Sequence, residues 1–363
     1  MQSRLFFAGL YLFTVIKWAA IAVVIGVLSG AVGSAFHHSV DRATLWRSEM
    51  PWLLYGLPLA GAAIVGIYKL TRTEGQGTND VLDEIHIGQG LSLRLLPSIF
   101  FGTFLTHLCG GSSGREGAAL QMGGVIGYHT ARLFRLDDRD RRTATAAGMA
   151  AFFTALFGTP MAASVFALTV VSVGRYYTGD LLPCLAASLS AYGCSLLLAV
   201  EPTRFTVSAP PLSVGMTLRV AALAAVCALA SVLFCETVRA SERLLQKRFP
   251  NPWMRAVSGG LTLIALTLLS GTRDYNGAGM DIITAAVERG TARPEAFLCK
   301  LLFTALTLGA GFKGGEVVPS FFIGATFGAA AGPLFGIPPR SRRRSDWWAC
   351  SAARRTRRWQ AYF

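Results

Sequence analysis

Two glycine-rich segments, each with a glutamate, contain the residues of this chain whose types and spacing are most suited to a functional site. The first reads Gly110-Gly-Ser-Ser-Gly-Arg-Glu-Gly117, and Gly311-Phe-Lys-Gly-Gly-Glu316 resembles it about 200 residues later. In an alignment of the two, Glu116 falls on Glu316, and each segment follows an apolar run and opens another. A helix that begins at such a break inside a membrane points unpaired N–H groups, and the positive end of its dipole, at whatever lies before it. This arrangement attracts an anion without burying a full positive charge.

A second pair of glycine-rich segments precedes the first pair at matched spacing. Gly75-Gln-Gly-Thr-Asn-Asp80 has a counterpart in Gly277-Ala-Gly-Met-Asp281. Gly77 lies 39 residues before Glu116, and 37 residues separate their counterparts. Glycine-interrupted apolar segments at corresponding places in two halves mark binding sites in membrane transporters. We therefore predict an internal duplication in which four helix starts converge on one anion, at Gly77, Gly114, Gly279 and Gly315. The alternative is that these glycines only let helices pack closely.

The composition is that of a membrane protein. The chain has 363 residues, 52% of them hydrophobic and 15% charged, whereas soluble domains carry roughly 25% charge. Its mean hydropathy is +0.46, and several apolar runs approach or exceed the ~20 residues that cross a bilayer as a helix. We predict an all-α, multi-pass integral protein of the plasma or inner membrane, built from tilted and broken transmembrane helices in an inverted internal repeat.

Much of the net charge of +14 lies beside the apolar runs, at residues 135–142 and 340–358. Basic residues in such places orient membrane proteins and contact lipid headgroups, so we expect a lipid bilayer as partner and no nucleic acid. The seven cysteines form no CxxC pair, and the five histidines form no HExxH motif. No metal site and no cofactor are therefore predicted.

The apolar runs predict one transmembrane domain over residues 1–337, with repeat halves at about 10–175 and 180–337. The first run, residues 5–36, is too long for a signal peptide, so we expect a retained helix that leaves the membrane at His37 and His38. Residues 136–142 are predicted to form a solvated loop. The other expected helices cover residues 51–70, 80–87, 91–108, 117–134, 143–156, 161–173, 181–200, 214–247, 255–269, 280–287, 294–308 and 317–335. Residues 338–363 form a basic, Trp- and Arg-rich tail that either lies on anionic headgroups or is an aberrant end replacing further helices; we favour the second interpretation.

Glu116 is the residue to which the pattern gives the most specific role. A carboxylate at a helix start within an apolar chain is costly unless it is paired or functional. At an anion-attracting terminus it would occupy the anion site itself, and protonation or movement of the side chain would open the path. The alternative is a surface glutamate that caps its own helix. Arg115 and Lys313 would add positive potential beside the two breaks.

A different function, serine hydrolysis, also has a motif in the first segment. Gly110-Gly-Ser-Ser-Gly114 matches the GxSxG pattern of a nucleophile elbow, and either Ser112 or Ser113 could act inside the membrane as the nucleophile. The elbow needs a preceding strand, whereas the preceding segment reads as a helix. An intramembrane serine hydrolase would also need a histidine that faces the serine. We keep it as the second interpretation.

Three of these segments resemble the motifs of the CLC family of chloride channels and anion/proton antiporters, in the same order and with similar spacing. They are Gly114-Arg-Glu-Gly-Ala118, Gly315-Glu-Val-Val-Pro319 and Gly75-Gln-Gly-Thr-Asn79. The resemblance covers roughly residues 10–336. It implies a non-enzymatic, homodimeric transporter of chloride or another small halide, either a voltage-gated channel or an anion/proton antiporter. It assigns the gate to Glu116, and the anion-binding positions to Gln76, Gly77, Thr78, Gly114, Arg115, Gly315, Glu316 and Val317.

The chain departs from the family pattern at several positions. Gln76 stands where the family commonly has a coordinating serine, and Val317 replaces a phenylalanine. Glu316 is similar to the fluoride-exporting branch, which makes fluoride a candidate beside chloride. The internal proton-transfer glutamate of typical antiporters aligns near Thr169 or Val170. The family's last helices have no counterpart after Ile337. These departures leave chloride or fluoride, and channel or antiporter, as open alternatives.

Overall fold

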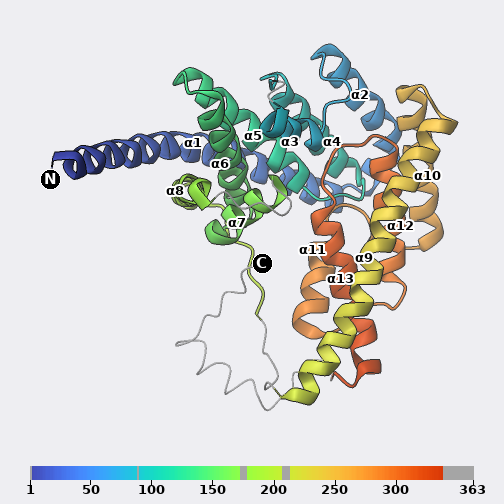
Figure 1. The fold of residues 1–363 in the computed structure, drawn as a ribbon. Coiled ribbons are helices and arrows are strands. Elements are labelled where there is room, and N and C mark those ends of the chain that lie inside the picture. Colours follow the sequence, from blue (N-terminus) through green and yellow to red (C-terminus); the bar gives the residue numbers. More distant parts are fainter. Residues whose placement is uncertain (1, 88–89, 172–177, 207–212, 338–363) are drawn as a thin grey trace.

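A computed structural model describes residues 2–87, 90–171, 178–206 and 213–337 of the chain (Figure 1). The tail predicted at 338–363 lies outside the described residues. The described part is helical and contains no strand. Its α-helices are α1 (Gln2–Glu49), α2 (Leu57–Leu70), α3 (Thr78–Ile87), α4 (Leu95–Cys109), α5 (Glu116–Leu133), α6 (Asp138–Phe157), α7 (Pro160–Val171), α8 (Thr178–Leu197), α9 (Val214–Arg248), α10 (Pro252–Ser270), α11 (Met280–Thr284), α12 (Ala296–Gly309) and α13 (Val317–Ala331). Short 3-10 or π segments cover Pro51–Gly56, Ala285–Arg289 and Gly332–Phe335.

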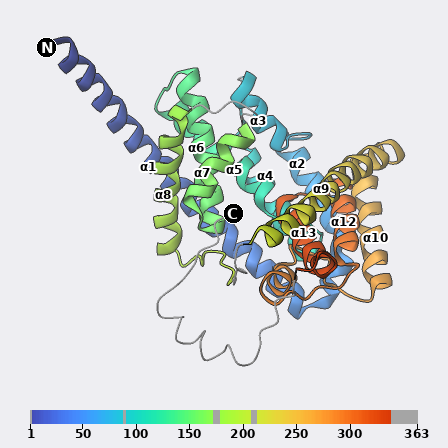
Figure 2. The ribbon, with the colours of Figure 1, turned by 60° about the horizontal axis from the view of Figure 1, so that its bottom comes forward.

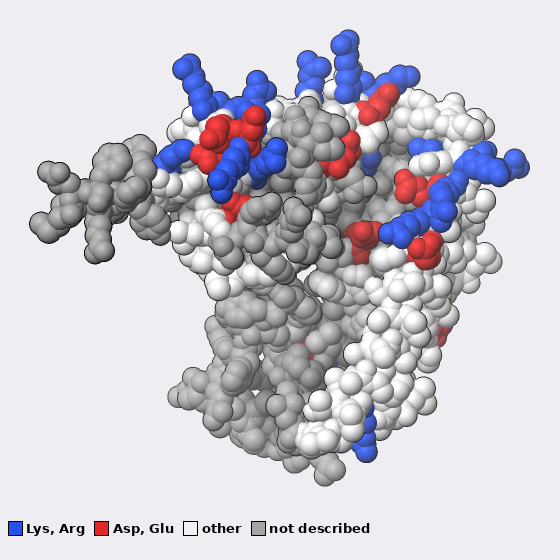
Figure 3. All heavy atoms as spheres, viewed as in Figure 1, with Lys and Arg blue, Asp and Glu red and all other residues white. Residues whose placement is uncertain are grey.

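Length and hydropathy fit the predicted membrane class. Among the described residues, six helical stretches are long and apolar enough to cross a membrane, the longest being Thr14–Glu49 and Val214–Arg248. On the face drawn in Figure 3, most of the visible Lys, Arg, Asp and Glu side chains lie in the upper half, and the described surface below them is largely uncharged. The prediction of an all-α, multi-pass membrane protein is confirmed.

The two halves of the sequence form two neighbouring groups of helices (Figures 1 and 2). In the first group α1 packs across α6 and α8, and α5 lies along α6. In the second group the long α9 runs beside α12 and α13. The helix α2 belongs to the first half by sequence, yet it packs against α10 of the second half, while α13 contacts α5. The groups therefore meet around the starts of α5 and α13.

Glycines allow α5 and α6 to lie in backbone contact. A Cβ atom added to Gly148 of α6 would lie 2.8 Å from the backbone nitrogen of Gly127 on α5, and would collide with the carbonyl oxygen of Gly123. Small residues at such crossings give membrane helices their close packing, since burial from water does not drive the helices together. This contact fixes the axis of α5, and with it the position of Glu116 at its first residue.

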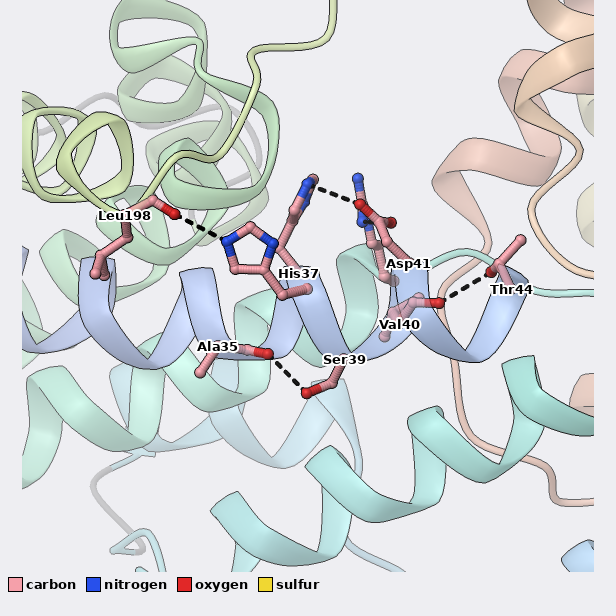
Figure 4. Close-up of polar contacts among 9 residues, drawn as sticks. Ala35, His37, Ser39, Val40, Asp41, Thr44 and Leu198 are labelled. Carbon is pink, nitrogen blue, oxygen red and sulfur yellow. Dashed lines mark hydrogen bonds and ion pairs between the residues drawn. The ribbon is translucent and has the colours of Figure 1, made fainter. Parts of the chain in front are cut away.

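The structure corrects three predicted boundaries. The first helix does not end near residue 36 but continues to Glu49. His37 pairs with Asp41 one turn later (Figure 4), and His38 contacts the carbonyl oxygen of Leu198, so both histidines lie within the helix and have partners there.

The other two corrections concern helix starts. The charged segment predicted as a loop at 136–142 instead starts α6, where the Asp137 side chain accepts a 2.7 Å hydrogen bond from the Asp140 amide. Acidic residues in a first turn are favoured by the helix dipole. Pro97, within an expected helix at 91–108, lies in the first turn of α4, where the missing N–H costs nothing.

We predict that Gly148→Ala destabilises the protein. The added methyl group would meet the backbone of α5, and overpacking of this kind costs about 1–3 kcal/mol in the free energy of unfolding. Gly193→Ala on α8 is the matched control, because no heavy atom lies within 4 Å of its added Cβ. Reversible unfolding in mixed micelles measures both variants. Equal stability of the two would show that α5 and α6 are not in backbone contact.

Candidate functional site

The two glycine-rich breaks, 200 residues apart in sequence, are hydrogen-bonded to each other. The Gly114 amide donates to the Gly315 carbonyl oxygen at 2.7 Å, and the Gly315 amide donates to the Gly114 carbonyl oxygen at 2.8 Å. These glycines lie two residues before the starts of α5 and α13. The pairing therefore brings two helix N-termini to one place.

The carboxylate of Glu116 lies at this meeting point. The residue is fully buried, and neither carboxylate oxygen has a hydrogen-bond partner among the described residues. A Cβ atom added to Gly114 would lie 2.6 Å from Oε1, and one added to Gly315 would collide with Oε2. The carboxylate thus rests against both glycines, in a space that any side chain would fill.

Backbone N–H groups surround this carboxylate. Those of Glu116 and Val318, in the first turns of α5 and α13, act on it from nearby without reaching hydrogen-bonding geometry. Helix N-termini favour negative charge, whereas a buried carboxylate with no hydrogen bond is costly. The arrangement can therefore hold a negative group and can exchange the carboxylate for another anion.

Side chains and amides from other elements hold the first break in place. Arg47 of α1 donates a 2.8 Å hydrogen bond to the His107 carbonyl, and Asn276 donates one of 2.8 Å to the Gly110 carbonyl. The Gly277 amide donates to the Gly111 carbonyl at 3.1 Å. The carbonyl groups left over at the end of α4 and in the turn after it are thus satisfied by α1 and by the second half of the chain. This fixes the turn that leads into α5.

Lys300 on α12 is a buried basic residue beside the site. It was not among the site residues predicted from the sequence. Its ammonium group is fully buried and donates to the carbonyl oxygens of Gly277, at 2.6 Å, and Tyr275, at 3.2 Å. It lies 5.1 Å from the centre of the Phe322 ring. No carboxylate pairs with it among the described residues, and its charge interacts with that of Glu116. The available signal was a lone lysine in an apolar run, which is a functional candidate by default in a membrane protein.

A polar cavity of about 680 Å³ borders the site, because Arg115 and Val318, the neighbours of Glu116 and Val317 in the sequence, line it. Its walls include Arg115, Arg47, Arg273, His107 and Val318. Arg115 does not bind Glu116; its guanidinium group forms a 3.0 Å ion pair with Asp41 of α1. Asp41 also pairs with His37 at 2.9 Å, so α1 supplies one wall of the approach (Figure 4).

The other anion-binding positions suggested by the resemblance are less directly placed. The Gly77 amide donates a 2.6 Å hydrogen bond to the side chain of Asp80, so this N–H is already engaged. Thr78 accepts a hydrogen bond from Gln121, five residues beyond Glu116 on α5 and thus about 7.5 Å along its axis. No described hydrogen bond joins residues 76–78 to Glu116.

The two remaining positions, at the start of α13, differ in exposure. Glu316 stands at the N-cap with an exposed side chain. Val317 follows it and lines an apolar cavity.

The serine-hydrolase interpretation has no geometric support. The Ser112 hydroxyl is hydrogen-bonded to that of Thr304 at 3.1 Å, and the Ser113 hydroxyl is buried without a partner among the described residues. His107 contacts the Gly114 carbonyl through Nε2, and His129 contacts the Leu91 carbonyl. No described histidine therefore activates either serine.

We predict that Gly315→Ala disrupts this site. An added Cβ would lie 2.6 Å from the Gly117 nitrogen and would displace the Glu116 carboxylate, at a cost of about 1–3 kcal/mol in the free energy of unfolding. Gly324→Ala, in the same helix α13, is the control because its Cβ would meet nothing within 4 Å. Its stability should be unchanged or about 0.5–1 kcal/mol higher. If Gly315→Ala were equally stable, the carboxylate would not rest on this glycine.

Comparison with known sequences identifies relatives along most of the chain. The family described as "Voltage gated chloride channel" matches residues 60–341. A chloride/fluoride channel protein from Pseudomonas syringae pv. tomato is 35% identical over 331 residues, covering 89% of this chain and 73% of the relative. An H(+)/Cl(-) exchange transporter, ClcA of Vibrio cholerae, is 28% identical over 341 residues, with 86% and 72% covered.

Solved structures show the same fold. A CLC-type fluoride/proton antiporter superimposes with a TM-score of 0.85 at 34% identity, covering 90% of this chain and 83% of that one. A slow cyanobacterial Cl⁻/H⁺ antiporter, at 20% identity, superimposes with a TM-score of 0.72 over 88% of this chain and 80% of that one, and supports the fold alone. The CLC resemblance inferred from the glycine motifs is confirmed, and so is the predicted architecture. The relatives are named as transporters or channels, and none of those compared is named as a hydrolase. With most of its length matched, the chain belongs to the voltage-gated chloride channel family, the CLC family.

Proposed function

We propose that this chain moves a small halide across the membrane through the point where α5 and α13 begin, with Glu116 as the gate. The observation that carries the proposal is the buried Glu116 carboxylate, which has no hydrogen-bond partner in the described part of the chain and rests between Gly114 and Gly315. A structural carboxylate would have a cation or donors of its own. One that competes for a site with a mobile anion needs to leave it readily.

The electrostatics define how the gate works. Two negative charges a few ångströms apart in a medium of low dielectric constant repel each other strongly, so the carboxylate and a halide do not share the site. The halide enters when the Glu116 side chain moves out or takes up a proton. Protonation removes the carboxylate's negative charge and with it the attraction of the helix N-termini. Proton uptake and anion entry at one residue would link the two movements.

Fluoride is the first candidate for the anion, and exchange with protons is the first candidate for the mode. The antiporter that superimposes with a TM-score of 0.85 is described as a fluoride/proton antiporter, and the relative at 35% identity is named a chloride/fluoride channel protein. Glu316 adds support through its likeness to the fluoride-exporting branch. Transport needs no bond chemistry, so the proposal assigns no catalytic residue and no cofactor.

The functional unit we propose is one transport domain over residues 1–337, working as a homodimer in the lipid bilayer. The hydrogen bonds between Gly114 and Gly315 support the single domain, because neither repeat half completes the site alone. Support for a partner or lipid beside α8 comes from its exposed leucines, which include Leu182, Leu189 and Leu197.

We predict that Glu116→Ala uncouples the anion from the proton. In liposomes loaded with fluoride or chloride, an imposed pH gradient should change the anion efflux of the wild type, and the ratio of efflux with and without the gradient should fall to one in the variant. The control is Glu236→Ala, which removes an exposed glutamate on α9. Identical behaviour of Glu116→Ala and wild type would exclude Glu116 from the mechanism.

We also predict that Lys300→Met weakens anion binding about tenfold, a loss of about 1.4 kcal/mol. When it is protonated, the buried Lys300 side chain carries a positive charge that interacts with Glu116, so it should also act on an anion at the same place. The halide concentration at half-maximal flux is the measurement, with Lys247→Met at the exposed end of α9 as the control. An unchanged half-saturation concentration would mean that Lys300 only holds the loop at Tyr275 and Gly277.

A further inference from the structure

The turn between α5 and α6 carries a surplus of positive charge, because residues 132–142 hold five arginines and three aspartates. Each aspartate already has a partner. Asp137 accepts a 2.7 Å hydrogen bond from the Asp140 amide. Asp138 forms a 3.0 Å ion pair with Arg141, and the Asp140 carboxylate forms one of 2.5 Å with Lys17 of α1. The described residues give no ion pair to the other four arginines, which are Arg132, Arg135, Arg139 and Arg142.

Two arginines of this turn are held against one tyrosine. Tyr128, near the end of α5, is 6% exposed. The guanidinium carbon of Arg132, on α5, lies 6.0 Å from the centre of its ring, and that of Arg141, in the first turn of α6, lies 5.8 Å from it. The Arg141 Nε atom is buried and has no hydrogen-bond partner among the described residues. A guanidinium group that is stacked in this way keeps its planar N–H donors oriented, and such donors match the oxygens of a phosphate.

Exposed apolar side chains beside these arginines favour a lipid phosphate over a free phosphate ion. Leu133 is 78% exposed and Phe134 is 47% exposed, and both follow Arg132 directly in the sequence. A phosphate ion offers them nothing to pack against, whereas a phospholipid supplies acyl chains that bury apolar area. Charged side chains lie at the upper left of Figure 3, where Figure 1 shows this turn, and the described surface below is largely uncharged. Lipid headgroups lie at such a boundary.

We propose that Arg132 and Arg141 bind the phosphate of an anionic phospholipid whose acyl chains lie along Leu133 and Phe134. The other arginines of the turn favour a headgroup with a net negative charge, because the ammonium group of a zwitterionic lipid would meet like charge there. The start of α6 adds the positive end of a helix dipole. This lipid site is separate from the halide site at Glu116 and does not rest on the proposed function.

Native mass spectrometry of the purified chain in a neutral detergent tests the binding, with phosphatidylglycerol and phosphatidylcholine of equal acyl chains as probes. We expect phosphatidylglycerol to bind about tenfold more tightly, a difference of about 1.4 kcal/mol. Equal affinities would overturn the charge assignment. Inorganic phosphate in large excess should leave the lipid bound, and its displacement by phosphate would overturn the lipid assignment.

Variants locate the lipid on the chain. The double variant Arg132→Gln/Arg141→Gln should weaken phosphatidylglycerol binding about tenfold. The control Arg239→Gln/Arg243→Gln removes the same charge from the exposed end of α9 and should bind as the wild type does. Equal losses in both, or none in the first, would show only unspecific attraction to basic surface and contradict the site.

Single variants keep the test valid if the loss of the Arg141–Asp138 ion pair prevents folding. Arg132→Gln alone removes an exposed side chain that has no ion pair among the described residues, and it should still weaken phosphatidylglycerol binding measurably. Leu133→Gln should also weaken it, whereas Leu244→Gln, at a similarly exposed position of α9, should not. Unchanged binding in Arg132→Gln would overturn the phosphate site, and unchanged binding in Leu133→Gln would overturn the acyl-chain contact.

Discussion

The contact between Gly114 and Gly315 is the constraint on which the rest of the structure depends. Two backbone segments from opposite halves of the chain meet there through paired amide and carbonyl groups. Only residues without a side chain allow this approach, since a Cβ on either glycine would strike the Glu116 carboxylate. The contact aims the starts of α5 and α13 at one point. The close packing of α5 on α6 and the docking of Asn276 and Gly277 onto the end of α4 both serve to hold it.

Charge is distributed around this point in a way that suits a mobile anion. The groups nearest the Glu116 carboxylate are backbone amides, which attract a negative ion without forming the tight ion pair that an arginine would form. The full positive charges are set back: Arg115 is paired with Asp41, and Lys300 with backbone carbonyl groups. A site built from partial charges binds an anion and also releases it, which transport requires.

Much of the fold could be predicted from the sequence because its signals are local and periodic. Apolar runs, Pro and Gly breaks and the repeated glycine motifs placed the helices within a few residues, and Gly158 and Pro160 separate α6 from α7 as expected. The predictions failed where polar residues were interpreted without knowledge of the residues that they contact. His37 and His38 were expected to follow the end of the first helix, but His37 pairs with Asp41 within a continuous helix, and Asp41 also pairs with Arg115.

Parts of the candidate site could not be predicted from the sequence for the same reason. The pairing of Gly114 with Gly315 needs the relative position of two halves, which spacing alone does not supply. The resemblance pointed to Gly77 as an anion ligand, yet Asp80 three residues later already binds its amide. Lys300 carried a signal, a charge in an apolar run, but its role depends on carbonyl groups more than 20 residues away.

The central claim is that an anion takes the place of the Glu116 carboxylate between the two glycines, and the most direct test is to locate that anion. Crystals of Glu116→Ala grown in bromide would show its position by anomalous scattering. The account predicts an anomalous peak against Gly114 and Gly315, within reach of the amides at the starts of α5 and α13, and no such peak at this place in the wild type while the carboxylate occupies it. Bromide found only among the arginines of the polar cavity, with the space between Gly114 and Gly315 empty, would contradict the account.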